Sequence, residues 1–361
     1  MPEENILIYR LGSLGDSIMA LPAFHAIRRA FPHARITLLT NKPVASKAAP
    51  VEAVLGTGYF FDEVLDYPLG TRNPLVLVTL MSKLRRLRLD GVFNLAEFRS
   101  DRSTLRDRTF FRLTGARHLY GFDLAVEDRM AVPNPMTGEV EWEAARIARR
   151  VEPIAQAHLA QPEFWDLQLT DQETSTAHNL LAPLVSRDKI LALSTGTKVQ
   201  AKHWGVRNWI ELSSRLSKRL PGWTALFLGS PEEFPESAAC AEAWSGPSLN
   251  LCGSCPPRVS AAVLKHCQVF IGHDSGPMHL AACVGTPCVA IFSARNLPRQ
   301  WFPRGDLNQI IYNKTDCAGC GLEVCILEKK KCLSGISVDQ VEQATESLLE
   351  KVRHRKAQIH P

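Results

Sequence analysis

Residues 272–282 read GHDSGPMHLAA, and this stretch decides the fold that the sequence predicts. The run at 268–271 leads into it and indicates a buried strand. A short apolar helix pattern begins at Pro277 and is stopped by Gly-Thr-Pro at 285–287, and a second buried strand follows at 288–292. The stretch is therefore a loop of small and polar residues between a strand and the N-terminus of a helix.

Such a loop is suited to bind an anion. Pro277 fits the first helical position, and Ser275 can cap the helix. Free backbone N–H groups and the helix dipole favour negative charge there, as at phosphate sites on the carboxyl edge of α/β sheets. A well-capped core helix is the alternative, but Asp274, Ser275 and His279 around Gly276-Pro277 favour a ligand.

The composition is that of an ordinary globular protein. With 361 residues, the chain is long enough for about two domains. Hydrophobic residues make up 45% and charged residues 22%, which excludes disordered and fibrous classes. There is no run of about 20 apolar residues and no signal-peptide layout at the N-terminus, so we expect a cytoplasmic location.

The formal net charge of +5 is too small to imply nucleic-acid binding by itself, but the positive residues are unevenly spread. One interpretation is a solvated helical face. The other is a surface for an anionic substrate or for the inner leaflet of a membrane. The basic residues that crowd one region of the first half are Lys83, Arg85, Arg86, Arg88, Arg99, Arg102, Arg106, Arg108, Arg112 and Arg117.

Strand and helix patterns alternate in two series. The first series begins with a strand at 5–9, and the pattern restarts with a strand at 189–194. This predicts an α/β protein of two Rossmann-like, doubly wound domains that face a central cleft. We expect the first domain at 1–172, the second at 173–336, and a last helix within 337–361 that packs back on either domain.

A glycine-bearing loop follows the first strand. Gly12, Gly15 and Asp16 resemble half of a dinucleotide-binding fingerprint, whose first glycine has no counterpart here. Asp16 opens the next helix, so an N-cap is its structural role. A catalytic role is compatible with that one, because a carboxylate held ionised at a helix N-terminus can accept a proton from a hydroxyl.

The second series carries candidate ligands for a diphosphate. Lys198 and Lys202 follow the small polar loop Thr195-Gly196-Thr197, near the sheet edge at which phosphates bind. Glu232 and Glu233 follow a later strand and a Gly-Ser-Pro turn. As first-turn glutamates they stabilise a helix through its dipole, and the alternative is that one of them accepts hydrogen bonds from a ribose diol.

All ten cysteines lie between Cys240 and Cys332, which is not the spread of a secreted disulfide framework. Four of them form a compact cluster that can wrap one tetrahedral zinc or iron ion. Such a closed site would be structural, because it leaves no coordination position open for chemistry. Free or partly oxidised thiols and disulfides are the alternatives. The four are Cys317, Cys320, Cys325 and Cys332.

Three segments together resemble glycosyltransferase family 9, the ADP-heptose:lipopolysaccharide heptosyltransferases and their relatives. They are ILIYRLGSLGD at 6–16 with LPA at 21–23, KHW at 202–204, and DSGPMHLAA at 274–282 with Gly-Thr-Pro at 285–287. The resemblance implies a GT-B fold, with the acceptor in the first domain and a nucleotide-diphosphate sugar in the second. It also implies an inverting transfer that uses no metal ion or other cofactor for catalysis.

The resemblance further implies roles for single residues. Asp16 falls on the family's proposed general base, Lys202 on the lysine that contacts the donor diphosphate, and Glu233 on the glutamate that holds the ribose. Gly205 stands where the family often has proline after the tryptophan, which keeps Lys198 as the alternative lysine. The remaining residues assigned to donor binding are Thr195, Thr197, Asp274, Ser275, Gly276, Pro277 and His279.

These observations predict a transferase that moves a sugar to a hydroxyl of an anionic glycolipid such as the lipopolysaccharide core. By resemblance the sugar is heptose from ADP-heptose. We expect no nucleic-acid partner and a peripheral contact with the inner face of the membrane. Two other classes stay open: a dinucleotide-dependent oxidoreductase, and a non-catalytic four-cysteine metal protein that binds nucleic acid. The motifs identify neither the base and sugar of the donor nor the acceptor.

Overall fold

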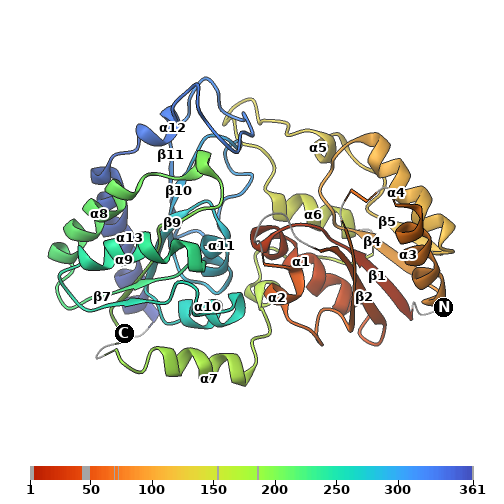
Figure 1. The fold of residues 1–361 in the computed structure, drawn as a ribbon, viewed down its shortest axis with the longest axis horizontal. Helices are drawn as coiled ribbons and strands as arrows, with labels where there is room; N and C mark the ends of the chain where they lie inside the picture. Colours follow the sequence, from red (N-terminus) through yellow and green to blue (C-terminus); the bar gives the residue numbers. More distant parts are fainter. Residues whose placement is uncertain are drawn as a thin grey trace. The chain divides into compact units, whose positions relative to one another are not determined.

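The computed structural model describes residues 4–42, 49–68, 70–71, 73–152, 154–184 and 187–359. The chain forms two compact units, Met1–Gln168 and Leu169–Pro361, each with a parallel sheet of its own (Figure 1). The predicted α/β class is therefore confirmed. Residues 1–3 of the predicted first domain and residues 360–361 of the predicted last segment lie outside the described residues.

The first unit alternates strands and helices along the chain. Its elements are β1 (Asn5–Tyr9), α1 (Leu14–Ala30), β2 (Arg35–Asn41), α2 (Val51–Leu55), β3 (Glu63–Tyr67), α3 (Pro74–Arg86), β4 (Gly91–Asn94), α4 (Asp101–Leu113), β5 (His118–Tyr120), α5 (Val126–Arg129), α6 (Glu143–Val151) and the 3₁₀ turn η1 (Pro162–Trp165). The strands pair in parallel in the order β3-β2-β1-β4-β5. Ile6, Leu7 and Ile8 of β1 are fully buried, as expected of a central strand covered on both faces.

The second unit repeats this plan. Its elements are α7 (Asp171–Leu180), β6 (Ile190–Ser194), η2 (Gln200–Lys202), α8 (Val206–Arg219), β7 (Thr224–Phe227), η3 (Pro231–Glu233), α9 (Phe234–Glu242), β8 (Ser248–Asn250), α10 (Pro257–Leu264), β9 (Val269–His273), α11 (Gly276–Cys283), β10 (Cys288–Phe292), β11 (Gln309–Tyr312), α12 (Lys331–Ser334) and α13 (Val338–Ile359). Its six strands are parallel in the order β11-β10-β9-β6-β7-β8.

The order of the strands determines where the loops next to the predicted site residues lie. In each sheet the first strand in sequence is central, with β1 between β2 and β4 and β6 between β9 and β7. Ligands of doubly wound sheets bind beyond the carboxyl ends of the strands, where the winding reverses. The loop after β1, which leads into the first turn of α1 with Asp16, and the loops after β6 and β9 start at these positions.

The sequence left open which domain holds the last helix. α13 packs on α8 and on β9, β10 and β11, so it belongs to the core of the second unit. Its Val341, Leu348 and Leu349 are buried there. Among the described residues, no helix combines the length and the apolar character that a membrane crossing requires. The predicted cleft between the two domains stays a prediction.

Candidate active site

The predicted phosphate loop lies at the carboxyl end of β9, where Asp274 is buried. Lys202 reaches Asp274 from η2: its Nζ donates to the Asp274 carbonyl oxygen at 3.0 Å and lies 2.7 Å from Oδ2. His279, in the first turn of α11, places Nε2 3.8 Å from Oδ1. The structure therefore gathers three predicted residues into one buried cluster.

In this cluster, the positive charge of Lys202 stabilises the ionised carboxylate of Asp274. Burial by itself raises the pKa of the Asp274 carboxyl, but the Lys202 ammonium and then His279 outweigh burial and hold that pKa well below its usual value. An ammonium has three N–H donors, and Asp274 takes two of those on Lys202. The third donor is left for a ligand at the sheet edge.

Two buried polar atoms at the start of α11 have no hydrogen-bond partner within the described part of the chain, namely Ser275 Oγ and His279 Nδ1. Ser275 is the N-cap residue, but its side chain makes no capping bond, which corrects the expectation that it caps the helix. The helix begins at Gly276, so Pro277 is its second residue and not its first. Because buried polar atoms are rarely unpaired, this helix start is suited to a ligand.

The sequence predicted no role for His273, the last residue of β9. Its buried ring accepts a hydrogen bond at Nε2 from the Trp204 N–H at 3.0 Å, and Nδ1 lies 3.2 Å from the Gly196 carbonyl oxygen. These partners assign the proton to Nδ1. Burial lowers the pKa of His273 to about 3, so the ring is neutral. His273 thus joins the segment of Lys202 to the loop of Thr195 and positions both.

Glu233 lies at the end of η3, against two glycines. Its Oε2 accepts a hydrogen bond from the Ser230 N–H at 2.8 Å. A Cβ atom on Gly196 would stand 2.3 Å from Glu233 Cδ, and one on Gly229 would stand 2.1 Å from Oε2. Burial raises the pKa of the Glu233 carboxyl. The two glycines therefore make room for an acidic side chain beyond β6 and β7.

Thr195, Thr197 and Lys198, which were also predicted to bind the donor, lie outside the cluster of Lys202, Asp274 and His279. Thr195 is fully buried, with Oγ1 3.3 Å from Ser237 Oγ, and Thr197 Oγ1 accepts a hydrogen bond from the Val199 N–H at 3.3 Å. Lys198 is exposed, and its charge offsets part of the rise that burial causes in the pKa of Glu233. Since Lys202 makes the contacts with Asp274, it and not Lys198 belongs to the cluster at α11.

In the first unit, Asp16 is held in one orientation. It is the third residue of α1, Ser13 is the N-cap, and Oδ2 accepts hydrogen bonds from the Ser13 N–H and Oγ, both at 2.7 Å. Asp16 is therefore the partner of the N-cap in a capping box, which corrects its expected role as the cap itself. Gly12 has φ +129°, and a Cβ there would stand 2.6 Å from Asp16 Cβ. Gly15 lies between them, in the first turn of α1.

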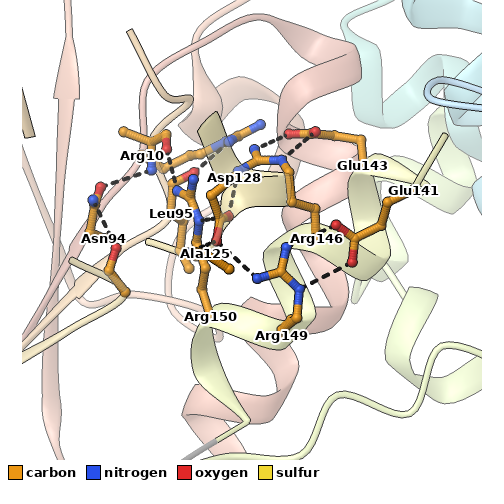
Figure 2. A network of polar contacts seen from close by, with 12 residues as sticks. Arg10, Asn94, Leu95, Ala125, Asp128, Glu141, Glu143, Arg146, Arg149 and Arg150 are labelled. Carbon is orange, nitrogen blue, oxygen red and sulfur yellow. Dashed lines mark hydrogen bonds and ion pairs between the residues drawn. The ribbon is translucent and has the colours of Figure 1, made fainter. Parts of the chain in front are cut away.

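Arg10 connects Asp16 to the end of β4. Its buried guanidinium donates to the Leu95 carbonyl oxygen (Figure 2). It also donates, at 2.6 Å, to the Asp16 carbonyl oxygen and lies 3.6 Å from Asp16 Oδ1. The Asp16 side chain keeps 23% of its surface exposed. Oδ2 thus accepts two hydrogen bonds, while Oδ1 faces the Arg10 guanidinium.

A buried ionic network supports this loop from α6. Asp128 lies 3.2 Å from Arg146, 2.9 Å from Arg149 and 2.8 Å from Arg150, and Figure 2 shows the three arginines converging on it. Arg150 also donates to the Ala96 carbonyl oxygen at 2.6 Å, next to Leu95. The network fixes α6 to the end of β4, and sequence patterns gave no signal for it.

Comparison with known proteins decides the family. The model of glycosyltransferase family 9 (heptosyltransferase) matches residues 105–331, more than half of the chain. The chain belongs to glycosyltransferase family 9.

Solved structures confirm the GT-B type of fold for this family 9 chain. A glycosyltransferase of family 9 from Veillonella parvula superimposes with a TM-score of 0.73 at 18% identity, over 97% of this chain and 98% of that one. The E. coli ADP-heptose lipopolysaccharide heptosyltransferase II gives a TM-score of 0.64 at 17% identity, over 96% and 99% of the two chains.

Two relatives are lipooligosaccharide heptosyltransferases 2 of Campylobacter jejuni subsp. jejuni. The protein of serotype O:2 is 25% identical over 176 residues, which are 46% of this chain and 54% of that protein. The match thus spans about half the length of that relative. The protein of serotype O:6 is 21% identical over 337 residues, 91% of this chain and 94% of that protein.

The four clustered cysteines of this family 9 chain differ in exposure. Cys332 is buried, Cys317 and Cys325 are half-buried and Cys320 is exposed, and all four are free thiols. Among the described residues, no three His, Cys, Asp or Glu side chains are placed to hold a metal ion. As placed, the sulfur atoms do not fit a closed tetrahedral site, and the predicted zinc or iron ion stays a prediction.

Proposed function

We propose that this chain transfers a sugar from a nucleotide diphosphate to a hydroxyl of a lipopolysaccharide-core glycolipid, with ADP-heptose as donor. One observation carries the proposal: Lys202 and Asp274 pair beside a helix start at which Ser275 Oγ and His279 Nδ1 are buried and unpartnered. Family membership and the heptosyltransferase names of the relatives support the sugar and the acceptor.

In the proposed donor complex, the diphosphate lies over the N-terminus of α11. The free N–H of Lys202, the first backbone N–H groups of the helix and Ser275 Oγ donate hydrogen bonds to its oxygens. These donors stabilise the charge that grows on the leaving diphosphate. Glu233 accepts hydrogen bonds from the ribose diol, because it is an acidic side chain at the same sheet edge.

In the proposed chemical step, Asp16 is the general base. The acceptor oxygen attacks the anomeric carbon, its proton passes to Asp16, and the bond to the diphosphate breaks with its electron pair on the leaving group. This single displacement inverts the anomeric centre. The support is local: Asp16 Oδ2 is fixed by Ser13, so the carboxylate is oriented before the acceptor arrives.

A dinucleotide-dependent oxidoreductase is less consistent with this site. Dinucleotide folds place a pyrophosphate at the N-terminus of the first helix. Here the carboxylate of Asp16 already occupies the N-terminus of α1 through its bonds with Ser13. No observation favours a nucleic-acid-binding metal protein, since the described cysteines form no metal site.

We also propose that the enzyme works in the cytoplasm, in peripheral contact with the inner leaflet. α3 and α4 lie side by side (Figure 1). Arg85 of α3 donates hydrogen bonds from Nε and Nη2 to the carbonyl oxygen of Leu113, the last residue of α4, at 3.1 and 3.0 Å. Leu75 and Val78 of α3 are 74% and 64% exposed, and Leu105 of α4 is 65% exposed. α3 has no acidic residue. Exposed apolar side chains among arginines are typical of surfaces that bind anionic membranes.

Thermal denaturation with ADP, UDP, GDP, CMP or NAD, without divalent metal, tests the donor site. A ligand of the native state raises the midpoint, by about 2.7 kcal/mol of stability at a hundredfold excess over Kd. We expect stabilisation by ADP. The control is the double variant Lys202→Met/Asp274→Asn, because removing Lys202 alone leaves a buried charge unpaired at a cost of about 3–5 kcal/mol.

The double variant is expected to fold and to lose the response to ADP. A response to NAD alone, or an equal response to ADP in the double variant, contradicts the proposed donor site. Transfer itself is followed by NMR of the product, whose anomeric configuration must be opposite to that of the donor. Retention of configuration contradicts the single displacement.

A further inference from the structure

Residues 319–330 form a surface segment of the second unit that contacts the turn of the proposed donor lysine. The segment lies between β11 and α12 in the chain and contains no helix or strand. Its large apolar side chains are 46–93% exposed, so hydrophobic burial does little to fix the segment; they are Leu322, Val324, Ile326 and Leu327. The position of the segment therefore depends mainly on its hydrogen bonds.

Three hydrogen bonds join this segment to the residues around Lys202. They are Cys325 N–H to Gln200 Oε1, Ala201 N–H to the Glu323 carbonyl oxygen, and Lys330 Nζ to the His203 carbonyl oxygen, each 2.9 Å long. Lys202 is the last residue of η2, so the bonds involve the two residues before it and the one after it. The backbone of Lys202 is therefore held on both sides, and its side chain reaches Asp274 from a fixed point.

Lys330 makes the strongest of these three bonds. Its ammonium is a charged donor, and charge-assisted hydrogen bonds are about twice as strong as neutral ones. The Lys330 side chain is half-buried, which strengthens the bond relative to one in water. The backbone N–H of Lys330 also donates to Cys325 Sγ at 3.4 Å. The bonds to Gln200 and His203 are thus connected within the segment.

The other end of the segment bonds to a loop that contacts Asp274. The Gly319 N–H donates to the Ala294 carbonyl oxygen, in the loop after β10, at 2.8 Å. Asn296 of the same loop places Nδ2 3.4 Å from Asp274 Oδ2. The 319–330 segment therefore connects the turn that carries Lys202 to the loop next to the partner of Lys202.

We infer that the 319–330 segment positions the donor lysine, with Gln200 and Lys330 as the positioning residues. The inference rests on the proposed function, because it takes Lys202 as a ligand of the diphosphate. Gln200 and Lys330 act through the backbone of η2 and not on the donor itself. A lysine that is held before the donor arrives binds more tightly, because less conformational freedom is lost on binding.

Hydrogen exchange tests the positioning without any ligand. The Ala201 N–H bonds to the segment, so a peptide that covers 200–204 reports whether η2 is held. We expect this peptide to exchange several-fold faster in Gln200→Met and in Lys330→Met, because methionine fills similar space but makes neither bond. Exchange in β9 should stay unchanged, which distinguishes local release of η2 from general unfolding.

Calorimetry with ADP measures the consequence for the donor. We expect the Kd to rise about tenfold in Lys330→Met and about threefold in Gln200→Met, since the first loses a charge-assisted bond and the second a neutral one. Gln200→Met changes no charge, so its effect separates positioning from electrostatic attraction. Lys330→Arg keeps a charged donor and should bind ADP nearly like the wild type. The KM of the acceptor should be unchanged in all of these variants.

Lys329→Met is the matched control. Lys329 is exposed and precedes Lys330, and both have a left-handed backbone, with φ of 45° and 54°. The control therefore removes the same charge from the same kind of position, without loss of a bond to η2 among the described residues. It should exchange and bind ADP like the wild type.

Unchanged exchange at 200–204 in both methionine variants overturns the inference, and so does an equal loss of ADP affinity in Lys329→Met. If ADP binding depends on the Lys202–Asp274 pair but not on Gln200 or Lys330, the proposed donor site stands and the positioning role fails. If the wild type does not bind ADP, the proposed donor fails, while faster exchange in the variants still supports the hold of the segment on Lys202.

Discussion

At the scale of single residues, the Asp16 carboxylate is held by Ser13 and its side chain stays 23% exposed. Ser13 holds Oδ2, and Asn at this position can still accept that hydrogen bond. We therefore expect Asp16→Asn to fold and to bind ADP like the wild type, while kcat falls about 10²–10⁴-fold, the usual contribution of a general base. Single-turnover transfer assays measure the loss.

Asp123→Asn is the control for this prediction. Asp123 is an exposed carboxylate of the same unit, and it pairs with Arg108 on the surface. Its removal is expected to leave kcat unchanged. A near-full transfer rate in Asp16→Asn would falsify the base assignment, and a loss of ADP binding would show that the substitution disturbs more than proton transfer.

His273 predicts a pH dependence of stability. Its pKa is about 3 in the folded chain, because burial disfavours the charged ring, and about 6.5 in the unfolded chain. Between these values the unfolded state binds one more proton, so stability is fully present above pH 6.5 and is lost as the pH falls. The expected slope is about 1.4 kcal/mol per pH unit.

Urea unfolding at pH 7, 6 and 5 measures this effect as a difference between the wild type and His273→Gln. Gln also offers a donor and an acceptor, so it can bridge the Gly196 carbonyl oxygen and the Trp204 N–H. The stability difference should shrink as the pH falls, because other titrating groups are common to both chains. A constant difference contradicts the buried neutral ring. If the variant does not fold, an NMR titration of the wild type gives the pKa directly.

At the scale of elements, local patterns predicted the strands and helices well, because apolar periodicity is a property of neighbouring residues. Helix starts were predicted less well: Asp16 and Pro277 each lie one or more positions further into their helices than expected. The contacts of His273 with Trp204 and Gly196 join residues 69 and 77 positions apart. No local pattern records such contacts, so the sequence could not reveal the role of His273.

The α3–α4 surface leads to a prediction about membranes. Leu75 and Leu105 are exposed to 74% and 65%, so burial of their side chains in a bilayer gains about 1.5–3 kcal/mol each. We expect the chain to float with vesicles that contain anionic lipid, and Leu75→Ser/Leu105→Ser to reduce the bound fraction several-fold. High salt should reduce binding further, because it screens the arginines.

Leu327→Ser is the matched control, because Leu327 is 93% exposed but lies in the second unit. It should bind vesicles like the wild type. Binding that is equal for the double variant, or equal for anionic and zwitterionic vesicles, contradicts a membrane-binding face on α3 and α4. Transfer to a deacylated acceptor should be unaffected in all three proteins, which separates membrane contact from catalysis.

At the scale of the whole molecule, the two units carry complementary chemistry on the same architecture. Each places its functional loops at the carboxyl edge of a parallel sheet, beside the central strand. In the first unit, the helix start is occupied by the carboxylate of Asp16, the proposed base. In the second unit, the first turn of α11 has no acidic residue, and the buried Ser275 Oγ has no hydrogen-bond partner among the described residues. This difference supports the proposal that the acceptor hydroxyl binds at the first unit and the diphosphate at the second.

Under the proposed mechanism, the charges at α11 predict that transfer needs no metal ion. The third N–H of Lys202, the helix N-terminus with about half a positive charge, and Ser275 Oγ together offset charge on the leaving diphosphate. We expect the transfer rate to stay within about twofold after dialysis against EDTA, because electrostatic stabilisation comes from the protein itself. Added Mg²⁺ or Mn²⁺ should not raise it.

Metal analysis of the dialysed protein separates catalysis from the cysteine cluster. If EDTA abolishes transfer and Mg²⁺ restores it, the donor site needs a cation and the charge argument at α11 is wrong. If EDTA removes zinc or iron and the chain unfolds, the ion is structural, and Cys320→Ser should reproduce the unfolding because it removes one of the four sulfur ligands. Only the first outcome bears on the diphosphate, since a closed cysteine site has no position for a substrate.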